Sequence, residues 1–249
     1  MTDREDQTIA LPPERIIRLL SEGDIEVEGL IPWSSNATIL VTVRDAEHSA
    51  LAVYKPQRGE RPLWDFAQGT LGMREVASYL VSEELGWGLV PPTVLRQGPH
   101  GLGSVQFYIH CVESAHFFSI QDDERYRHEL KRLVALDAVI NNADRKSGHC
   151  LVGYDGRLWA IDNALTFHEE PKLRTVIWDY AGDPLPYDIR TDLRRLEEAL
   201  GEVSPLTQVL EKILSKAEVR ALRGRMEGLL QDGCFPVPGA GRVVPWPLV

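Results

Sequence analysis

The chain has 249 residues, of which 43% are hydrophobic and 26% charged. This composition is typical of a globular protein and excludes an intrinsically disordered chain. Its formal net charge of −10 argues against nucleic acid as a partner and against docking on an anionic membrane, because both surfaces carry negative charge.

The cysteines and the hydropathy pattern indicate the compartment. Cys111, Cys150 and Cys234 have neither metal-ligand nor disulfide-framework spacing. No apolar run reaches the roughly 18 residues of a membrane-spanning helix, and the polar, acidic segment 1–8 does not resemble a signal peptide. We expect a cytoplasmic protein without stable membrane insertion.

The first half of the chain is predicted to consist mostly of strands. Two β-branched segments form a hairpin that ends at Pro56, and a helix with apolar pairs four residues apart follows it, stopping at Gly86. The predicted strands are 37–43, 50–55, 90–95 and 105–112, and the predicted helices are 14–20 and 73–85.

The second half is predicted to be mostly helical. A helical repeat over 124–140 leads into a polar loop, and the pair Asp155-Gly156 marks a tight hairpin. The remaining elements are strands at 150–152 and 158–161, helices at 191–200 and 206–230 with a break near Ser215, and a Pro/Gly-rich tail from Pro236. The pattern predicts an α+β chain in two lobes with a seam near 112–124, and a cleft between lobes is a common ligand site.

Two aspartates flank the predicted hairpin. Asp144 lies in the loop that enters it and Asp162 in the loop that leaves it, so the hairpin should bring the two carboxylates side by side. Two neighbouring carboxylates repel each other unless a cation lies between them, and Mg²⁺ bound to nucleotide phosphates is such a cation. The alternative interpretation is that both are solvated turn residues.

Three further features precede the aspartates in the order that phosphoryl transfer needs. Lys55 ends an apolar strand and either reaches a phosphate or extends to solvent at the sheet edge. Glu75 lies early in the next helix, where it either pairs with Lys55 or favours the helix N-terminus. Ser34, Ser35 and Asn36 form a small polar loop whose backbone N–H groups could approach a phosphate.

Taken together, these segments resemble the phosphatidylinositol 3-/4-kinase-like superfamily, in particular the type II phosphatidylinositol 4-kinases and their bacterial relatives. The resemblance covers roughly residues 30–170. It rests on the sequences AVYKP at 52–56, REVASYL at 74–80, LGWGLVPPT at 85–93, NNADR at 141–145 and AIDNALTF at 160–167.

The resemblance implies a two-lobed protein-kinase-like fold, with an N-terminal antiparallel sheet lobe carrying one helix and a mainly helical C-terminal lobe. The implied lobes are 12–112 and 120–235, followed by a tail at 236–249, in a single domain spanning 1–249.

It also implies ATP as the nucleotide and Mg²⁺ as its metal, with Mn²⁺ as the alternative. Lys55 would contact the phosphates and be held by Glu75, while Ser34, Ser35 and Asn36 would cover them. Cys111 and Val112, in the hinge segment, would flank the adenine. Asp144 would orient or deprotonate the acceptor hydroxyl, and Asp162 would bind the metal.

One position departs from the family pattern. His149 stands where the family has an asparagine that binds a second metal ion. Neutral imidazole is a poor ligand for Mg²⁺ and a better one for Mn²⁺ or Zn²⁺. His149 is therefore a candidate metal ligand, and catalytic competence is open.

We expect a phosphotransferase that passes the γ-phosphate of ATP to a hydroxyl of an unknown acceptor, whether small molecule, protein or lipid. Two alternatives use the same residues. One is a nucleotide-binding pseudokinase with a regulatory role, and the other is nucleotidyl transfer, with AMP as the transferred group.

Overall fold

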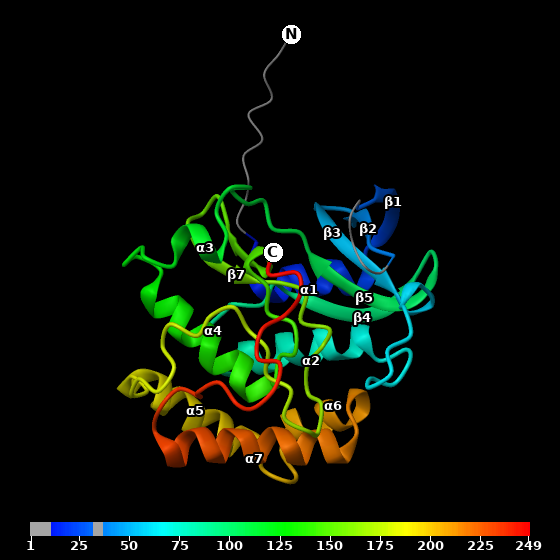
Figure 1. Ribbon diagram of the computed structural model, residues 1–249. Helices are drawn as coiled ribbons and strands as arrows, with labels where there is room; N and C mark the ends of the chain where they lie inside the picture. The colour runs from blue at the N-terminus through cyan, green and yellow to red at the C-terminus, as the bar shows by residue number, and fades with distance from the viewer. Residues whose placement is uncertain (1–10, 32–36) are drawn as a thin grey trace.

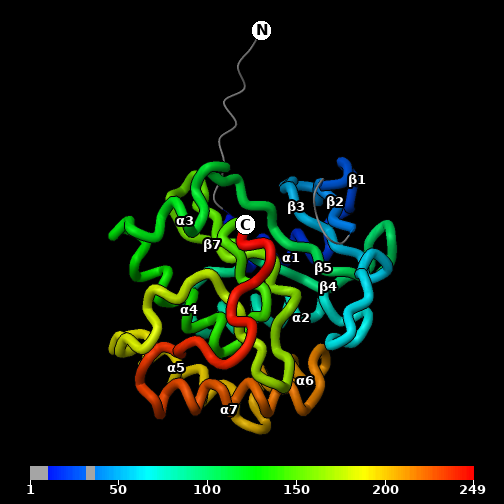
Figure 2. Tube along the Cα trace, in the orientation of Figure 1, coloured from blue at the N-terminus to red at the C-terminus, as the bar shows by residue number. Residues whose placement is uncertain are grey.

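The computed structural model describes residues 11–31 and 37–249. The predicted phosphate loop at Ser34, Ser35 and Asn36 lies outside these described residues. The chain forms a sheet lobe and a helical lobe, with α2 between them (Figures 1 and 2).

The sheet lobe is built on five antiparallel strands in the order β1-β2-β3-β5-β4. Side chains of β2 alternate between buried and partly exposed, so that Ile39, Val41 and Val43 pack together on one face. Leu19 and Leu20 of helix α1 cover this face and complete the apolar core of the sheet lobe. The bounds are α1 Pro13–Glu22, β1 Asp24–Leu30, β2 Ile39–Arg44, β3 Ser49–Pro56, β4 Thr93–Gly98 and β5 Gly101–Phe107.

Two features of this sheet differ from the sequence expectation. Strand β1 was not predicted; it is an edge strand whose side chains are mostly exposed, and three of its seven residues are acidic. Strand β4 begins at Thr93 rather than at residue 90, since Pro91 and Pro92 lack the N–H groups that a ladder needs. The lobe also carries α1 in addition to α2.

Helix α2, Leu71–Glu84, contacts the sheet on one side and α5 and α6 on the other. Its buried residues include the polar Arg74, Glu75 and Ser78 as well as apolar ones. The helix ends before Gly86, whose φ of +68° lies in the left-handed region that glycine adopts without strain.

The helical lobe encloses the larger core, to which α4 contributes Leu130, Leu133 and Leu136. The predicted break between the last two helices is confirmed: Ser215 begins α7 with a capping box that includes Glu218. The bounds are α3 Phe117–Ile120, α4 Arg127–Ile140, β6 Cys150–Val152, β7 Leu158–Ala160, α5 Tyr187–Ala199, α6 Pro205–Ile213 and α7 Lys216–Asp232. None of the helices in 11–31 and 37–249 has the length and apolarity needed to cross a bilayer.

The tail after α7 returns along the helical lobe toward the sheet lobe (red in Figures 1 and 2). The Val243 carbonyl accepts hydrogen bonds from Thr175 N and Trp178 Nε1, each at 3.1 Å. Further on, the Leu248 carbonyl accepts one from Ser147 N at 2.8 Å. The tail is thereby attached to the loop that contains Asp144.

Candidate active site

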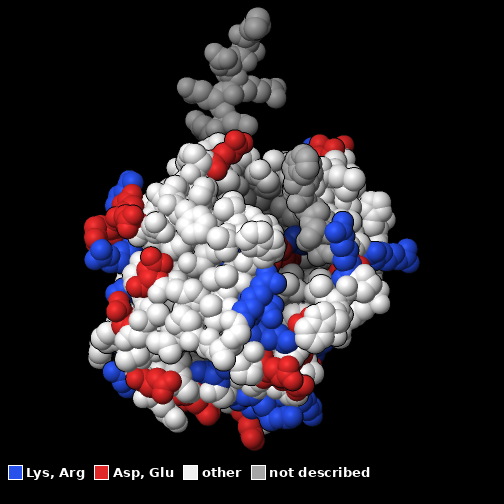
Figure 3. Space-filling view, in the orientation of Figure 1, with Lys and Arg blue, Asp and Glu red and all other residues white. Residues whose placement is uncertain are grey.

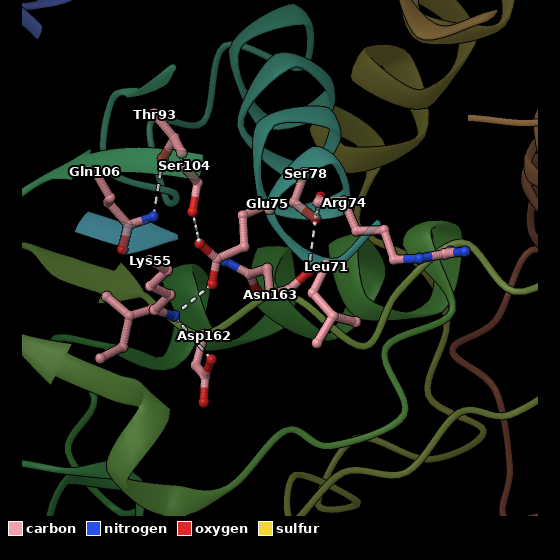
Figure 4. A network of polar contacts seen from close by, with 12 residues as sticks. Lys55, Leu71, Arg74, Glu75, Ser78, Thr93, Ser104, Gln106, Asp162 and Asn163 are labelled. Carbon is pink, nitrogen blue, oxygen red and sulfur yellow. Dashed lines mark hydrogen bonds and ion pairs between the residues drawn. The ribbon is translucent and has the colours of Figure 1, made fainter. Parts of the chain in front are cut away.

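Lys55 lies between two carboxylates contributed by different parts of the chain. Its Nζ is 2.5 Å from Glu75 Oε1 on α2 and 3.0 Å from Asp162 Oδ1 on the loop after β7 (Figure 4). Ser104 Oγ on β5 donates to the second oxygen of Glu75 at 2.8 Å. Because the Glu75 side chain is 1% exposed, this serine and the lysine supply the partners that a buried carboxylate needs.

The charges around Lys55 and Asp162 determine the protonation state of these two side chains. Burial by itself would lower the pKa of Lys55, but the carboxylates of Asp162 and Glu75 outweigh burial and raise it. The ammonium of Lys55 in turn lowers the pKa of Asp162 well below its ordinary value, against the opposing effect of burial. At neutral pH the pair is therefore fully charged.

The hairpin of β6 and β7 brings the two predicted loops together. Ile161 N donates to the His149 carbonyl at 3.0 Å, and Ala143 N donates to the Leu165 carbonyl at 2.8 Å. Asp162 has a φ of +55°, in the left-handed region that aspartate tolerates better than most residues. This local backbone turn fixes the direction in which its carboxylate leaves the hairpin.

Asp144 lies at the edge of the same group. Its side chain is 25% exposed, with Lys146 Nζ 3.4 Å from Oδ2, and its N–H donates to Asn142 Oδ1 at 2.9 Å. Burial raises the pKa of Asp144, Lys146 lowers it by a smaller amount, and the nearby charge of Asp162 raises it further. An accessible carboxylate with a raised pKa has the properties of a general base.

His149 faces Asp162 from the entering loop. Its Nε2 is 3.4 Å from Asp162 Oδ2, and its side chain is 13% exposed. Burial lowers the pKa of His149 to about 4, although Asp162 partly opposes this shift. The imidazole is therefore neutral at physiological pH. Its Nε2 faces the carboxylate of Asp162, the candidate metal ligand.

A buried network around Arg145 was not foreseen from the sequence. Its guanidinium is fully buried and makes two hydrogen bonds of 2.9 Å to the carboxylate of Asp137 on α4. It also donates to the Ile161 carbonyl at 2.9 Å and to Asn163 Oδ1 at 2.5 Å. Arg145 thus joins the Asp144 loop, the Asp162 loop and α4. The one signal in the sequence was a charged residue, Asp137, on the apolar side of a predicted helix.

Helix α2 is connected to the Asp162 loop by a second set of polar contacts. Arg74 Nη1 donates to the Thr166 carbonyl at 2.5 Å. Ser78 Oγ lies 3.4 Å from the carbonyl of Asn163, and both residues are labelled in Figure 4. Arg74 also pairs with Glu218 at the start of α7. The helix that holds Glu75 is therefore fixed relative to the helical lobe and to Asp162.

Lys55, Glu75, His149 and Asp162 line one cavity of about 850 Å³ between the lobes, and Lys146, the partner of Asp144, lines it as well. Among the described hinge residues, Cys111 lines the cavity, whereas Val112 is not part of its lining. Ile109 also lines it, and within 11–31 and 37–249 its backbone N–H and C=O have no hydrogen-bond partner. The polar part of the lining includes Lys55, Glu60, Glu75, Gln106, Lys146, His149 and Asp162.

The protein donors fit a metal that arrives with a ligand. Within the described residues, no group of three His, Cys, Asp or Glu side chains is arranged to hold a metal by itself. Asp162 Oδ1 accepts a hydrogen bond from Lys55, and Asp162 Oδ2 lies 3.4 Å from His149 Nε2. The Asp162 side chain is 42% exposed. Such a partial donor set suits a hard cation that takes its remaining ligands from phosphate oxygens and water.

Comparison with known proteins identifies a relative. No protein-family model matches the chain. Protein Rv2133c of Mycobacterium tuberculosis (strain ATCC 25618 / H37Rv) is 39% identical to it over 262 aligned positions, covering 92% of this chain and 94% of the relative. The chain belongs to the family of protein Rv2133c. The alignment spans nearly the whole of both proteins.

Solved structures show the fold. The Helicobacter pylori proinflammatory kinase CtkA superposes with a TM-score of 0.52 over 87% of this chain and 94% of its own, at 11% identity. Hydra Fam20, solved with sugar, gives 0.54 over 88% and 87%, at 14% identity. The Golgi casein kinase with Mn/ADP bound gives 0.50 over 94% and 78%, at 16% identity. The predicted α+β, two-lobed kinase-like fold is confirmed.

Proposed function

We propose that this protein is an ATP-dependent phosphotransferase that passes a γ-phosphate to a hydroxyl acceptor. The observation that carries the proposal is the meeting of Glu75, Lys55 and Asp162, from three separate elements, at the wall of one cavity. Phosphoryl transfer depends mostly on positioning and charge neutralisation, and this arrangement places a fixed cation beside an exposed carboxylate.

The cavity supports a nucleotide as the donor. Its volume of about 850 Å³ falls within the range of small-molecule sites. The unpartnered backbone groups of Ile109 could receive the edge of a purine, with Cys111 close by on the same segment. Lys55 would neutralise the phosphates, and Glu75 would hold its ammonium in place. Val112 was predicted from the sequence to contact adenine, but it does not line the cavity and is therefore a weaker candidate than Cys111.

Asp162 would hold a divalent metal together with the phosphates, and His149 is close enough to share that role. The metal, when bound, neutralises charge on the transferring phosphate. The Golgi casein kinase, solved with Mn/ADP, supports a nucleotide with a divalent ion as the ligand, and we take Mg²⁺ as the first candidate and Mn²⁺ as the second. Asp144, whose raised pKa suits a base, would accept the proton of the acceptor hydroxyl.

We further propose a single kinase-like domain with lobes at 12–112 and 120–235 and a tail at 236–249. Residues 52–56, 74–80 and 141–145 support a type resembling phosphatidylinositol 3-/4-kinases. CtkA and hydra Fam20 superpose over 87% and 88% of the chain with similar TM-scores, so the type rests on those sequence segments.

The test is nucleotide-dependent thermal stability of the wild type and Asp162→Ala, with ATP, ADP and GTP, each with Mg²⁺, Mn²⁺ or neither. A ligand at about 100 times its dissociation constant adds about 2.7 kcal/mol of stability, which is readily visible in a melting curve. We expect a metal-dependent ATP shift that Asp162→Ala removes. The absence of a shift with every nucleotide would reject the proposal.

One observation favours a second candidate, a nucleotide-binding regulator without catalysis. His149 is neutral and faces Asp162. It offers a nitrogen ligand at the position where the family that the sequence resembles has a metal-binding asparagine, whose ligand atom is an oxygen. ATP binding without transfer to any acceptor in either metal would support this candidate. Mass spectrometry of labelled products separates both from nucleotidyl transfer, because phosphate and AMP additions differ in mass.

A further inference from the structure

We propose that the mouth of the cavity beside Asp144 is an acceptor subsite for an anion, so that the acceptor is a small soluble molecule carrying a phosphate or carboxylate near its hydroxyl. Lys146, Arg174 and Arg242 would hold the anionic group. The inference rests on the proposed function, since it assigns the acceptor of the same site.

Three segments lie side by side next to Asp144, and each carries a cation: Lys146, Arg174 and Arg242. Arg174 N donates to the Asn142 carbonyl at 2.9 Å, and Arg145 N donates to the Arg174 carbonyl at 3.0 Å. Thr175 N donates to the Val243 carbonyl at 3.1 Å, which attaches the tail to the other side of the same segment. The positions of Arg174 and Arg242 are therefore fixed to the loop of Asp144 by backbone contacts.

Two of these cations have no acidic partner. Among the residues that the structure describes, neither Arg174 nor Arg242 forms an ion pair with a carboxylate, and Arg242 Nε donates to the Val244 carbonyl. Lys172, two residues earlier, behaves differently: its Nζ is 3.1 Å from Asp65, and its side chain is 8% exposed. The two arginine side chains are thus available to bind a ligand, whereas Lys172 is held in an ion pair with Asp65.

This concentration of positive charge opposes the overall charge of the chain, which is −10. Figure 3 shows Lys and Arg side chains on both sides of the hollow in the middle of this face. Arg242 is close enough to Asp144 for its charge to lower the pKa of that carboxyl slightly. A local cationic rim attracts anionic substrates and holds phosphate or carboxylate oxygens by charge-assisted hydrogen bonds.

The tail forms part of the cavity wall. Pro247 and Val249 line the cavity together with Leu71 and Ala164, and the Leu248 carbonyl accepts a hydrogen bond from Ser147 N at 2.8 Å. The tail is therefore attached to the loop that contains Asp144, and a cavity of about 850 Å³ has the size of a small-molecule site. On this ground we take a small soluble molecule as the occupant.

In the transfer step, the acceptor oxygen forms a bond to the γ-phosphorus as its proton passes to Asp144. The bond between the γ-phosphorus and the β,γ-bridging oxygen breaks, and ADP leaves with that electron pair. Lys146, Arg174 and Arg242 would bind the anionic group and place the hydroxyl within reach of Asp144.

The experiment compares matched acceptors that differ in charge: glycerol 3-phosphate with glycerol, and glucose 6-phosphate with glucose. We expect the anionic member to be phosphorylated with a kcat/KM about tenfold higher or more, the equivalent of one charge-assisted hydrogen bond. Calorimetric titration gives the same comparison for binding. Each of the four acceptors is titrated into the protein saturated with a non-hydrolysable ATP analogue. Added salt should reduce the preference.

Arg174→Gln and Arg242→Gln should each raise KM for the anionic acceptor about tenfold, with a smaller effect on kcat and a retained ATP-dependent thermal shift. Arg220→Gln, an exposed change on α7, is the matched control and should alter none of these values. Melting without ligand identifies any variant that fails to fold.

Equal use or equal binding of charged and neutral acceptors would overturn the subsite. So would phosphorylation confined to phosphatidylinositol in phosphatidylcholine vesicles or to an acidic serine peptide, with none of the soluble anions used. A missing ATP shift in the wild type would reject the proposed function and the subsite with it, whereas a normal shift without charge preference rejects the subsite alone.

Discussion

Lys55 and Asp162 are separated by 107 residues, yet the Nζ of one lies 3.0 Å from the Oδ1 of the other. The first residue ends a strand of the sheet lobe and the second follows a hairpin of the helical lobe. The contact therefore forms only when the two lobes are packed against each other. It places the fixed cation and the candidate metal ligand on one wall of the cavity.

Replacing Lys55 by Met should remove the ATP-dependent thermal shift, since the phosphates lose their main protein cation. Melting with ATP and Mg²⁺ measures the effect, and Lys216→Met, at an exposed helix start, should keep the wild-type shift. A Lys55→Met protein that still binds ATP with unchanged affinity would contradict the role assigned to this lysine.

Asp144→Asn should reduce phosphate transfer about 100-fold or more while leaving ATP binding intact, because it keeps the shape of the side chain and removes its basicity. Turnover with an accepted hydroxyl compound gives the first value, and the ATP-dependent thermal shift gives the second. Transfer at the wild-type rate would show that another group accepts the proton.

Asp137→Asn should destabilise the fold strongly. It leaves the guanidinium of Arg145, which is fully buried, without its compensating charge, and breaking a buried pair typically costs about 3–5 kcal/mol. Urea unfolding measures the loss. Glu22→Gln breaks the exposed pair with Arg18 on α1 and should cost less than about 1 kcal/mol. Similar losses from the two variants would argue against a special role for the buried pair.

The stability of the free protein should fall as the pH decreases from about 6.5 to 4. His149 has its pKa lowered to about 4 in the folded state, mainly by burial, so within this window the unfolded chain binds more protons than the folded one. The full shift corresponds to roughly 3 kcal/mol. Urea midpoints of the wild type and His149→Gln across this range provide the test.

The wild type should lose more stability than His149→Gln over that window, because glutamine does not titrate. Above pH 7 the two curves should run parallel. Identical pH profiles throughout would mean that His149 titrates normally in the folded protein and that the neutral imidazole assigned to the site is wrong.

The sequence by itself determined most of the elements and their order. Alternating apolar residues at Ile39, Val41 and Val43 specify a strand with one buried face, and Ser215 with Glu218 specifies a helix start. The loop–hairpin–loop pattern also indicated that Asp144 and Asp162 would be neighbours. These signals are local, because they depend on residues close together in the chain.

Only the tertiary structure decided which distant groups meet. The hydrogen bonds of Arg145 to Asp137 and Asn163, and of Ser104 to Glu75, join elements whose separation in sequence carries no periodic signal. Strand β1 was missed although Ile25 and Val27 alternate with acidic residues, and its place in the sheet comes from backbone pairing with β2. The attachment of the tail to Ser147 likewise depends on a backbone carbonyl, a group that every residue carries.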